Sequence, residues 1–116
     1  MEVFAHHIYE FKKGLRNLIL HTTHKAMKEK IIIRLEKEKI PYLIYPVGEK
    51  NINVFFGEAK CIDVIKSFKK QGLNDYTDEE DYILGIMLGY DCIKQCERYL
   101  KRKLKEKSFA EKLLTG

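Results

Sequence analysis

The strongest constraint on the fold is a β-hairpin predicted over residues 42–57. The runs YLIYPV and INVFFG are rich in β-branched and aromatic residues. The loop GEKN between them supplies Gly48 and Asn51, which tolerate positive φ. Both faces of the first run are apolar, which predicts a sheet covered by other elements on more than one side.

The second run of the hairpin alternates along its length. Its residues Ile52, Val54 and Phe56 are expected on one face of the sheet, with Asn53 and Phe55 on the other.

Before the hairpin, the first strand in chain order is predicted from Leu15 to His21. Thr22 and Thr23 are expected to cap a helix that ends near Lys39, before a proline. Strand, helix and hairpin then give a three-stranded mixed sheet, with the first strand parallel to the second through a right-handed crossover. A split order, with the third strand between the other two, agrees with this topology.

The remaining chain is expected to be helical. Residues 3–13 fit a helix by their four-three-four apolar spacing, with Gly14 as its end, although Lys12 to Gly14 also suit a hairpin turn. A further helix is expected from Ala59 to Gln71. The predicted fold class is therefore α+β, a small three-stranded mixed sheet packed against about five helices. Residues 1–116 are expected to form one domain, in which residues 108–116 either extend the last helix or are loosely ordered.

The densest apolar run lies within TDEEDYILGIMLGYDCIKQCERYL, where two helices are predicted. Thr77 and Glu80 have the spacing of a capping box. We expect Gly85 to admit a close neighbour, Gly89 to end the first helix, and Asp91 to cap the second.

The second of these helices carries an apolar stripe. Its members are Cys92, Ile93, Cys96, Tyr99, Leu100 and Leu104. We predict that this stripe faces the core, that Cys92 and Cys96 are small core residues, and that the basic residues lie largely on the other side. With Cys61 the cysteines are odd in number, which favours reduced thiols over a disulfide framework.

The formal net charge is +5, and the excess is concentrated in residues 98–107. The candidate partner-binding residues are Arg98, Lys101, Arg102 and Lys105. This segment lacks aromatic interleaving and any nucleic-acid motif, so a nucleic-acid partner is not expected. The acidic cluster of Asp75, Asp78, Glu79, Glu80 and Asp81 is a candidate magnesium or acid-base site, but helix capping explains it better.

The histidines are the candidate metal ligands. They are His6, His7, His21 and His24, and they converge only if the N-terminal segment packs beside the end of the first strand. A metal or haem site is the alternative hypothesis for these residues, but no known ligand spacing supports it, and surface or capping roles are favoured. No cofactor is otherwise predicted.

No membrane segment is expected. The longest apolar run, Tyr82 to Tyr90, is far shorter than the ~20 residues that cross a bilayer. The N-terminus has an acidic second residue and no basic leader, so we expect a cytoplasmic protein.

Three stretches together carry a family resemblance: HHIYEFKKGLRNLILHT, IPYLIYPVGEKNINVFFG and EEDYILGIMLGYDCIKQCERYL. They resemble a family of small bacterial proteins known only as a domain of unknown function, number two thousand and twenty-three, over about residues 2 to 104. The resemblance implies three strands, five helices, a homodimer and an association with flavodoxins. It assigns no catalytic residue.

The leading functional hypothesis is a non-enzymatic cytoplasmic homodimer that binds a partner, such as an acidic flavodoxin-type redox protein. The alternative is a metal- or haem-responsive regulatory protein that uses the four histidines. An enzyme built on Cys61 or on the acidic cluster has no supporting motif.

Overall fold

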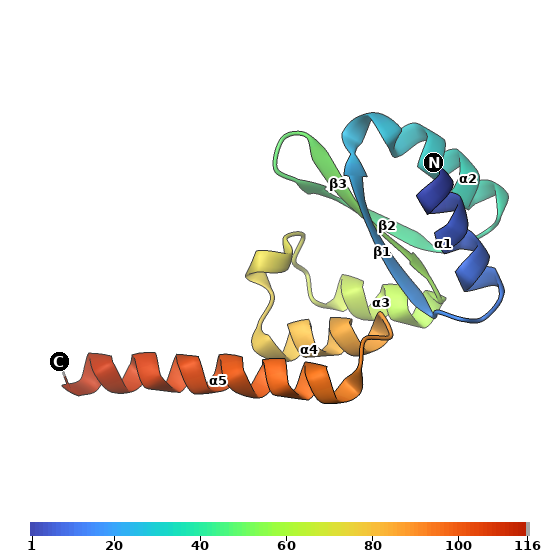
Figure 1. Ribbon diagram of the computed structural model, residues 1–116. Coiled ribbons are helices and arrows are strands. Elements are labelled where there is room, and N and C mark those ends of the chain that lie inside the picture. Colours follow the sequence, from blue (N-terminus) through green and yellow to red (C-terminus); the bar gives the residue numbers. More distant parts are fainter. Residues whose placement is uncertain (116) are drawn as a thin grey trace.

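The computed structural model describes residues 1–115 and shows an antiparallel sheet between two layers of helices (Figure 1). The elements in chain order are α1 (Glu2–Lys12), β1 (Leu18–His24), a 3₁₀ turn (Lys25–Met27), α2 (Lys28–Lys37), β2 (Tyr42–Val47), β3 (Asn51–Gly57), α3 (Ala59–Ser67), a second 3₁₀ turn (Leu73–Asp75), α4 (Asp78–Met87) and α5 (Cys92–Thr115). The α+β class is confirmed, and the described residues hold the three strands and five α-helices that were expected.

The strand order is β1-β3-β2, and β3 pairs antiparallel with both neighbours. The predicted hairpin and the split order are confirmed. The prediction of a mixed sheet is wrong, because β1 and β2 run in the same direction but are separated by β3. The central place suits β3, whose residues 52–57 are all buried. A strand that is apolar on both faces is most stable with neighbours on every side.

The strand β1 extends to His24, so the prediction that Thr22 and Thr23 begin a helix is wrong. Both threonines pair with β3, and the Thr22 hydroxyl donates to Asn53 Oδ1 at 2.5 Å. This bond gives the buried side chain of Asn53 a partner. His24 takes the capping role, since its Nδ1 accepts a hydrogen bond from the Ala26 N–H at 3.0 Å.

Two cores lie on opposite faces of the sheet. The first, beneath α1 and α2, is built from Phe4, Ile8, Ile19, Ile31, Leu35, Val54 and Phe56. The second, beneath α3 and α4, is built from Leu18, Phe55, Ile62, Ile65, Tyr76, Leu84 and Leu88. The strand β3 serves both cores through the predicted alternation of its side chains. Because α1 buries two residues in the first core, the helical interpretation of the N-terminal segment is confirmed.

The last helix, α5, is the outermost element. It packs along α4 on the side away from the sheet and projects beyond the rest of the molecule (Figure 1). This projection makes the molecule elongated, 57 × 32 × 24 Å. Residues 108–115 extend α5, whereas Gly116 lies outside the described residues. The helix α3 ends at Ser67, four residues before the predicted end.

Candidate functional site

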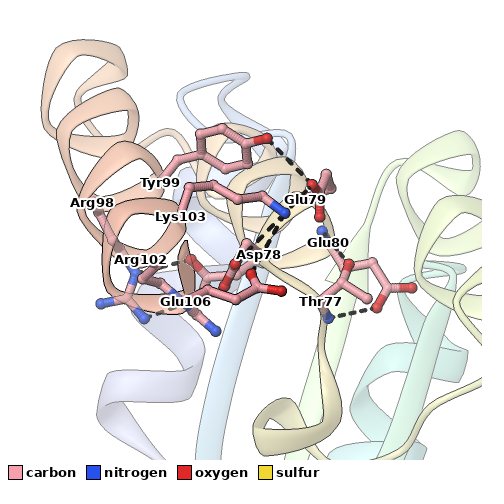
Figure 2. A network of polar contacts seen from close by, with 10 residues as sticks. Thr77, Asp78, Glu79, Glu80, Arg98, Tyr99, Arg102, Lys103 and Glu106 are labelled. Carbon is pink, nitrogen blue, oxygen red and sulfur yellow. Dashed lines mark hydrogen bonds and ion pairs between the residues drawn. The ribbon is translucent and has the colours of Figure 1, made fainter. Parts of the chain in front are cut away.

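The helices α4 and α5 form an antiparallel hairpin whose ends are fixed by the predicted capping residues. The Thr77 hydroxyl accepts from the Glu80 N–H at 3.1 Å, and the Glu80 carboxylate accepts from the Thr77 N–H at 2.8 Å (Figure 2). Gly89, with φ of +83°, reverses the chain after α4. Asp91 Oδ1 then accepts from the Ile93 N–H at 3.2 Å and begins α5.

The close neighbour that Gly85 admits belongs to the same chain. The Gln95 side chain of α5 lies directly over Gly85, and a Cβ at this position would stand 2.7 Å from its Cδ atom. A glycine in α4 therefore leaves room for the Gln95 side chain between the two helices.

Charged residues join α5 to α4 along the hairpin. Arg98 Nε lies 2.8 Å from Asp81 Oδ2. Arg102 Nε lies 2.7 Å from Asp78 Oδ1 (Figure 2). Lys103 Nζ lies 2.7 Å from Glu79 Oε1. The reversal at Gly89 thus brings the acidic cluster and the basic segment, which are distant in sequence, into contact.

These contacts hold the acidic side chains in their charged form. The hydrogen bond from Arg98 holds the pKa of Asp81 below its usual value, against the opposing effect of partial burial. Lys103 lowers the pKa of Glu79 by the same kind of bond, and the Tyr99 hydroxyl also donates to that carboxylate at 3.2 Å. Asp78, Glu79 and Asp81 therefore dock α5, and the lowered pKa values of Glu79 and Asp81 are the opposite of what a general acid needs.

The apolar stripe of α5 faces outward, so its prediction as a core face is wrong. Ile93, Leu100 and Leu104 are 65%, 63% and 69% exposed. Cys92 is exposed and Cys96 half-buried, which also corrects their prediction as core residues. The cause is that the charged side of α5 meets the charged start of α4. We call Ile93, Leu100 and Leu104 the outer stripe.

An apolar groove runs beside the outer stripe, between α4 and α5. It has a volume of about 500 Å³ and is lined by Glu79, Tyr82, Ile83, Cys96, Tyr99 and Leu100. The rings of Tyr82 and Tyr99 lie 5.6 Å apart, tilted by 58°. The Tyr82 hydroxyl lies 3.5 Å from Cys96 Sγ. Ile86, also half-exposed on α4, extends this apolar surface.

The four predicted partner-binding residues separate into two pairs. Arg98 and Arg102 are engaged with α4, whereas Lys101 and Lys105 form no ion pair with any residue in the described part of the chain. The free pair belongs to a lysine ridge, a line of exposed side chains at intervals of seven, four and seven residues along α5: Lys94, Lys101, Lys105 and Lys112. Such intervals place side chains on one side of a helix.

The histidines do not share a single site. His7 and His21 lie together, with ring centroids 5.5 Å apart, as expected if α1 packs on β1. His6 lies 3.4 Å from Glu10, and His24 is the cap described above. Within residues 1–115 no group of three or more histidine, cysteine or acidic side chains is arranged to hold a metal ion.

Burial is the main cause that lowers the pKa values of His7 and His21. For His7 the positive charge of Arg16 adds to this effect and Glu10 opposes it. For His21 the neighbouring His7 adds to it. The Nδ1 atom of His7 is buried and has no hydrogen-bond partner among the described residues.

The third cysteine, Cys61, lies in α3 against the second core. It is half-buried, and burial raises the pKa of its thiol. A raised thiol pKa is the opposite of what a nucleophilic cysteine needs. All three cysteines are free thiols, as expected.

Sequence reasoning missed the outward stripe and the groove. One signal for them was present in the sequence. Within each helix, two charged residues are spaced about one turn apart: Asp78 and Asp81 in α4, and Arg98 and Arg102 in α5. Counted outward from the turn at Gly89, the nearer aspartate pairs with the nearer arginine and the farther with the farther. Opposite charges in this order predict that the charged sides of the two helices meet.

These features define a small α+β protein with one antiparallel sheet and a projecting C-terminal helix that exposes its apolar side. Residues 2–102 match the family described as "Protein of unknown function (DUF2023)", and the chain belongs to this family. No curated protein matches the chain. In the described part of the chain, no helix combines the length and the apolar character that crossing a membrane requires.

Proposed function

We propose that this protein is a non-enzymatic homodimeric binding protein of the bacterial cytoplasm. One observation carries the proposal: α5 turns its charged side to α4 and leaves the outer stripe uncovered. An amphipathic helix normally does the opposite, since burial of apolar side chains is the main source of its stability. An uncovered stripe of this kind is the mark of a surface that meets another molecule.

The energy available from covering the outer stripe is sufficient for association. Full burial of a leucine or isoleucine side chain stabilises by about 1.5–3 kcal/mol relative to exposure. In a two-fold dimer each residue of the stripe is buried once in each subunit, so its contribution counts twice. The groove beside the stripe adds Tyr82, Ile83 and Cys96 to the contact. These gains offset the entropy that is lost on association.

A second copy of the chain is the occupant that this surface fits best. Most soluble oligomers are two-fold dimers in which the same patch serves both subunits. The outer stripe can serve as such a shared patch, because it runs along one straight helix. The stripes of two copies can pack against each other without any change in the rest of the fold.

Sedimentation equilibrium tests the dimer with a pair of matched variants. Leu100→Glu places a charge in the outer stripe. Ile33→Glu does the same at an isoleucine of α2 that is 67% exposed and lies far from the stripe. We expect the wild type and Ile33→Glu to sediment as dimers and Leu100→Glu to sediment as a monomer. A monomeric wild type, or a dimeric Leu100→Glu protein, contradicts the proposal.

The lysine ridge supports a second element of the proposed function, which is the binding of an acidic partner such as a flavodoxin-type redox protein. Its four side chains lie about a quarter of a turn around α5 from the outer stripe, and Lys101 and Lys105 lie beside Leu104. Long lysine side chains at the edge of a contact keep their ammonium groups in water. A row of uncompensated positive charges accelerates association with an acidic surface.

Binding of a flavodoxin-type protein at low and high salt tests this element. We expect the double variant Lys101→Glu, Lys105→Glu to bind more slowly than the wild type at low salt. The matched control is Lys30→Glu, Lys37→Glu, which reverses two exposed lysines on α2. Equal binding by both double variants, or no complex at low salt, would show that the ridge does not bind such a partner.

A further inference from the structure

We infer that the two copies pack their α5 helices antiparallel along the outer stripe, with the two-fold axis beside Arg102. This inference rests on the proposed homodimer and specifies its geometry. It follows from the spacing and order of the residues in the stripe, and from the length of α5.

Glu97, between two members of the outer stripe, and Lys107, beyond its last member, extend the stripe into a longer seam. Ile93, Glu97, Leu100, Leu104 and Lys107 follow one another at intervals of four, three, four and three. This is the spacing of residues that face a partner helix along a coiled-coil contact. All five are exposed, and none takes part in the ion pairs that dock α5 on α4.

Two copies of this seam match each other when the two helices run in opposite directions. Position 102 is the midpoint between Leu100 and Leu104, and also between Glu97 and Lys107. An antiparallel pair centred there puts Leu100 against Leu104 of the second copy, and Glu97 against its Lys107. Neither Glu97 nor Lys107 has an ion-pair partner in the described residues, so both are available for this contact.

A parallel arrangement is disfavoured by the same residues. It puts each Glu97 against the other Glu97 and each Lys107 against the other Lys107. Like charges that face each other destabilise an interface, whereas opposite charges stabilise it, so the antiparallel arrangement is favoured.

The length of α5 gives independent support. This helix has 24 residues, whereas α4 has only 10, so the last part of α5 projects past its neighbour (Figure 1). A projecting helix of about 12 residues is marginally stable in water without a packing partner. In the antiparallel pair this projection lies along the first half of α5 of the second copy, which supplies the missing partner.

A charge-exchange experiment tests the arrangement, with the dimer dissociation constant measured by sedimentation. Glu97→Lys and Lys107→Glu each create two like-charge pairs in the antiparallel dimer. We expect either change alone to weaken the dimer roughly 5- to 30-fold, and the double variant to recover most of the loss. Lys105→Glu is the control, because it changes a lysine of the ridge outside the seam. All three positions are exposed, and circular dichroism verifies that each variant is folded.

Two results would overturn the inference. If the wild type dimerises but the single variants lose no more affinity than Lys105→Glu, or the double variant does not recover, the antiparallel seam is wrong while the homodimer stands. If the wild type is monomeric at every concentration, both the seam and the homodimer are wrong.

Discussion

Arg98 donates two hydrogen bonds to Asp81, from Nε to Oδ2 at 2.8 Å and from Nη2 to Oδ1 at 3.1 Å. This bidentate contact, together with the ion pairs of Arg102 and Lys103, holds the charged side of α5 against α4. With the charged side turned inward, the three residues of the outer stripe stay 63–69% exposed. The exposure of the outer stripe is thus the consequence of the contacts that Arg98, Arg102 and Lys103 make with α4.

The contribution of this pair to stability is expected to be modest. A double-mutant cycle with Arg98→Ala and Asp81→Ala should give a coupling energy of about 0.5–1 kcal/mol, because the Arg98 side chain is half-exposed and water screens the pair. Urea unfolding at low and high salt measures it. The coupling should shrink at high salt, and a coupling that is independent of salt contradicts the electrostatic account.

Substitution of Gly57 should destabilise the fold. Its φ is +149°, and a Cβ there would collide with the backbone carbonyl oxygen of Asn17 and stand 3.0 Å from Leu18 Cα. Backbone atoms cannot move aside easily, so Gly57→Ala should cost roughly 1–3 kcal/mol or more. Gly85→Ala is the control, because there the obstacle is the flexible Gln95 side chain and alanine favours the helix. In thermal unfolding, the melting temperature of Gly57→Ala should be well below that of Gly85→Ala. The reverse order would contradict this explanation.

Stability should fall as the pH drops below about 6.5, the unperturbed pKa of histidine. Burial lowers the folded-state pKa values of His7 and His21, so the unfolded chain binds protons more readily than the folded one. The associated stability is complete above the unfolded pKa and is lost as the pH falls from there toward the folded values. Urea unfolding between pH 7.5 and about 5 measures this loss. The variant His7→Gln, His21→Gln should show a flatter dependence, and an unchanged slope would assign the effect to other groups.

Removal of the α4 cap should destabilise the hairpin. Thr77→Ala leaves the Glu80 N–H without its acceptor, at a cost of about 0.5–2 kcal/mol. Thr77→Ser retains the hydroxyl and should be close to neutral. Chemical unfolding of the two variants checks the cap, and equal losses would mean that the threonine methyl group, rather than its oxygen, is responsible.

Local sequence signals predicted the parts of the fold that depend on local chemistry. The GEKN loop predicted the hairpin of β2 and β3, and the spacing of Thr77 and Glu80 matches the capping box that is present. The end of β1 was not predicted, because a threonine suits a helix cap and a strand equally well. Only the contact between Thr22 and Asn53, 31 positions apart in the chain, decides between them.

The direction in which α5 faces could not be read from its apolar period. Periodicity states which residues share a side of a helix, but not which side meets the rest of the molecule. The usual assumption places the apolar side inward. It fails for Leu100 and Leu104 because the inner side is determined by the pairing of Arg98 and Arg102 with α4.

The central claim, that a second copy covers the outer stripe and its groove, is tested most directly by the reactivity of Cys96. This thiol lines the groove, whereas Cys61 lies in α3 outside it. The alkylation rate of each cysteine is measured by mass spectrometry over a range of protein concentrations that spans the dimer dissociation constant. The account predicts that Cys96 becomes protected as the concentration rises while Cys61 reacts at a constant rate. A Cys96 rate that does not change with concentration contradicts it.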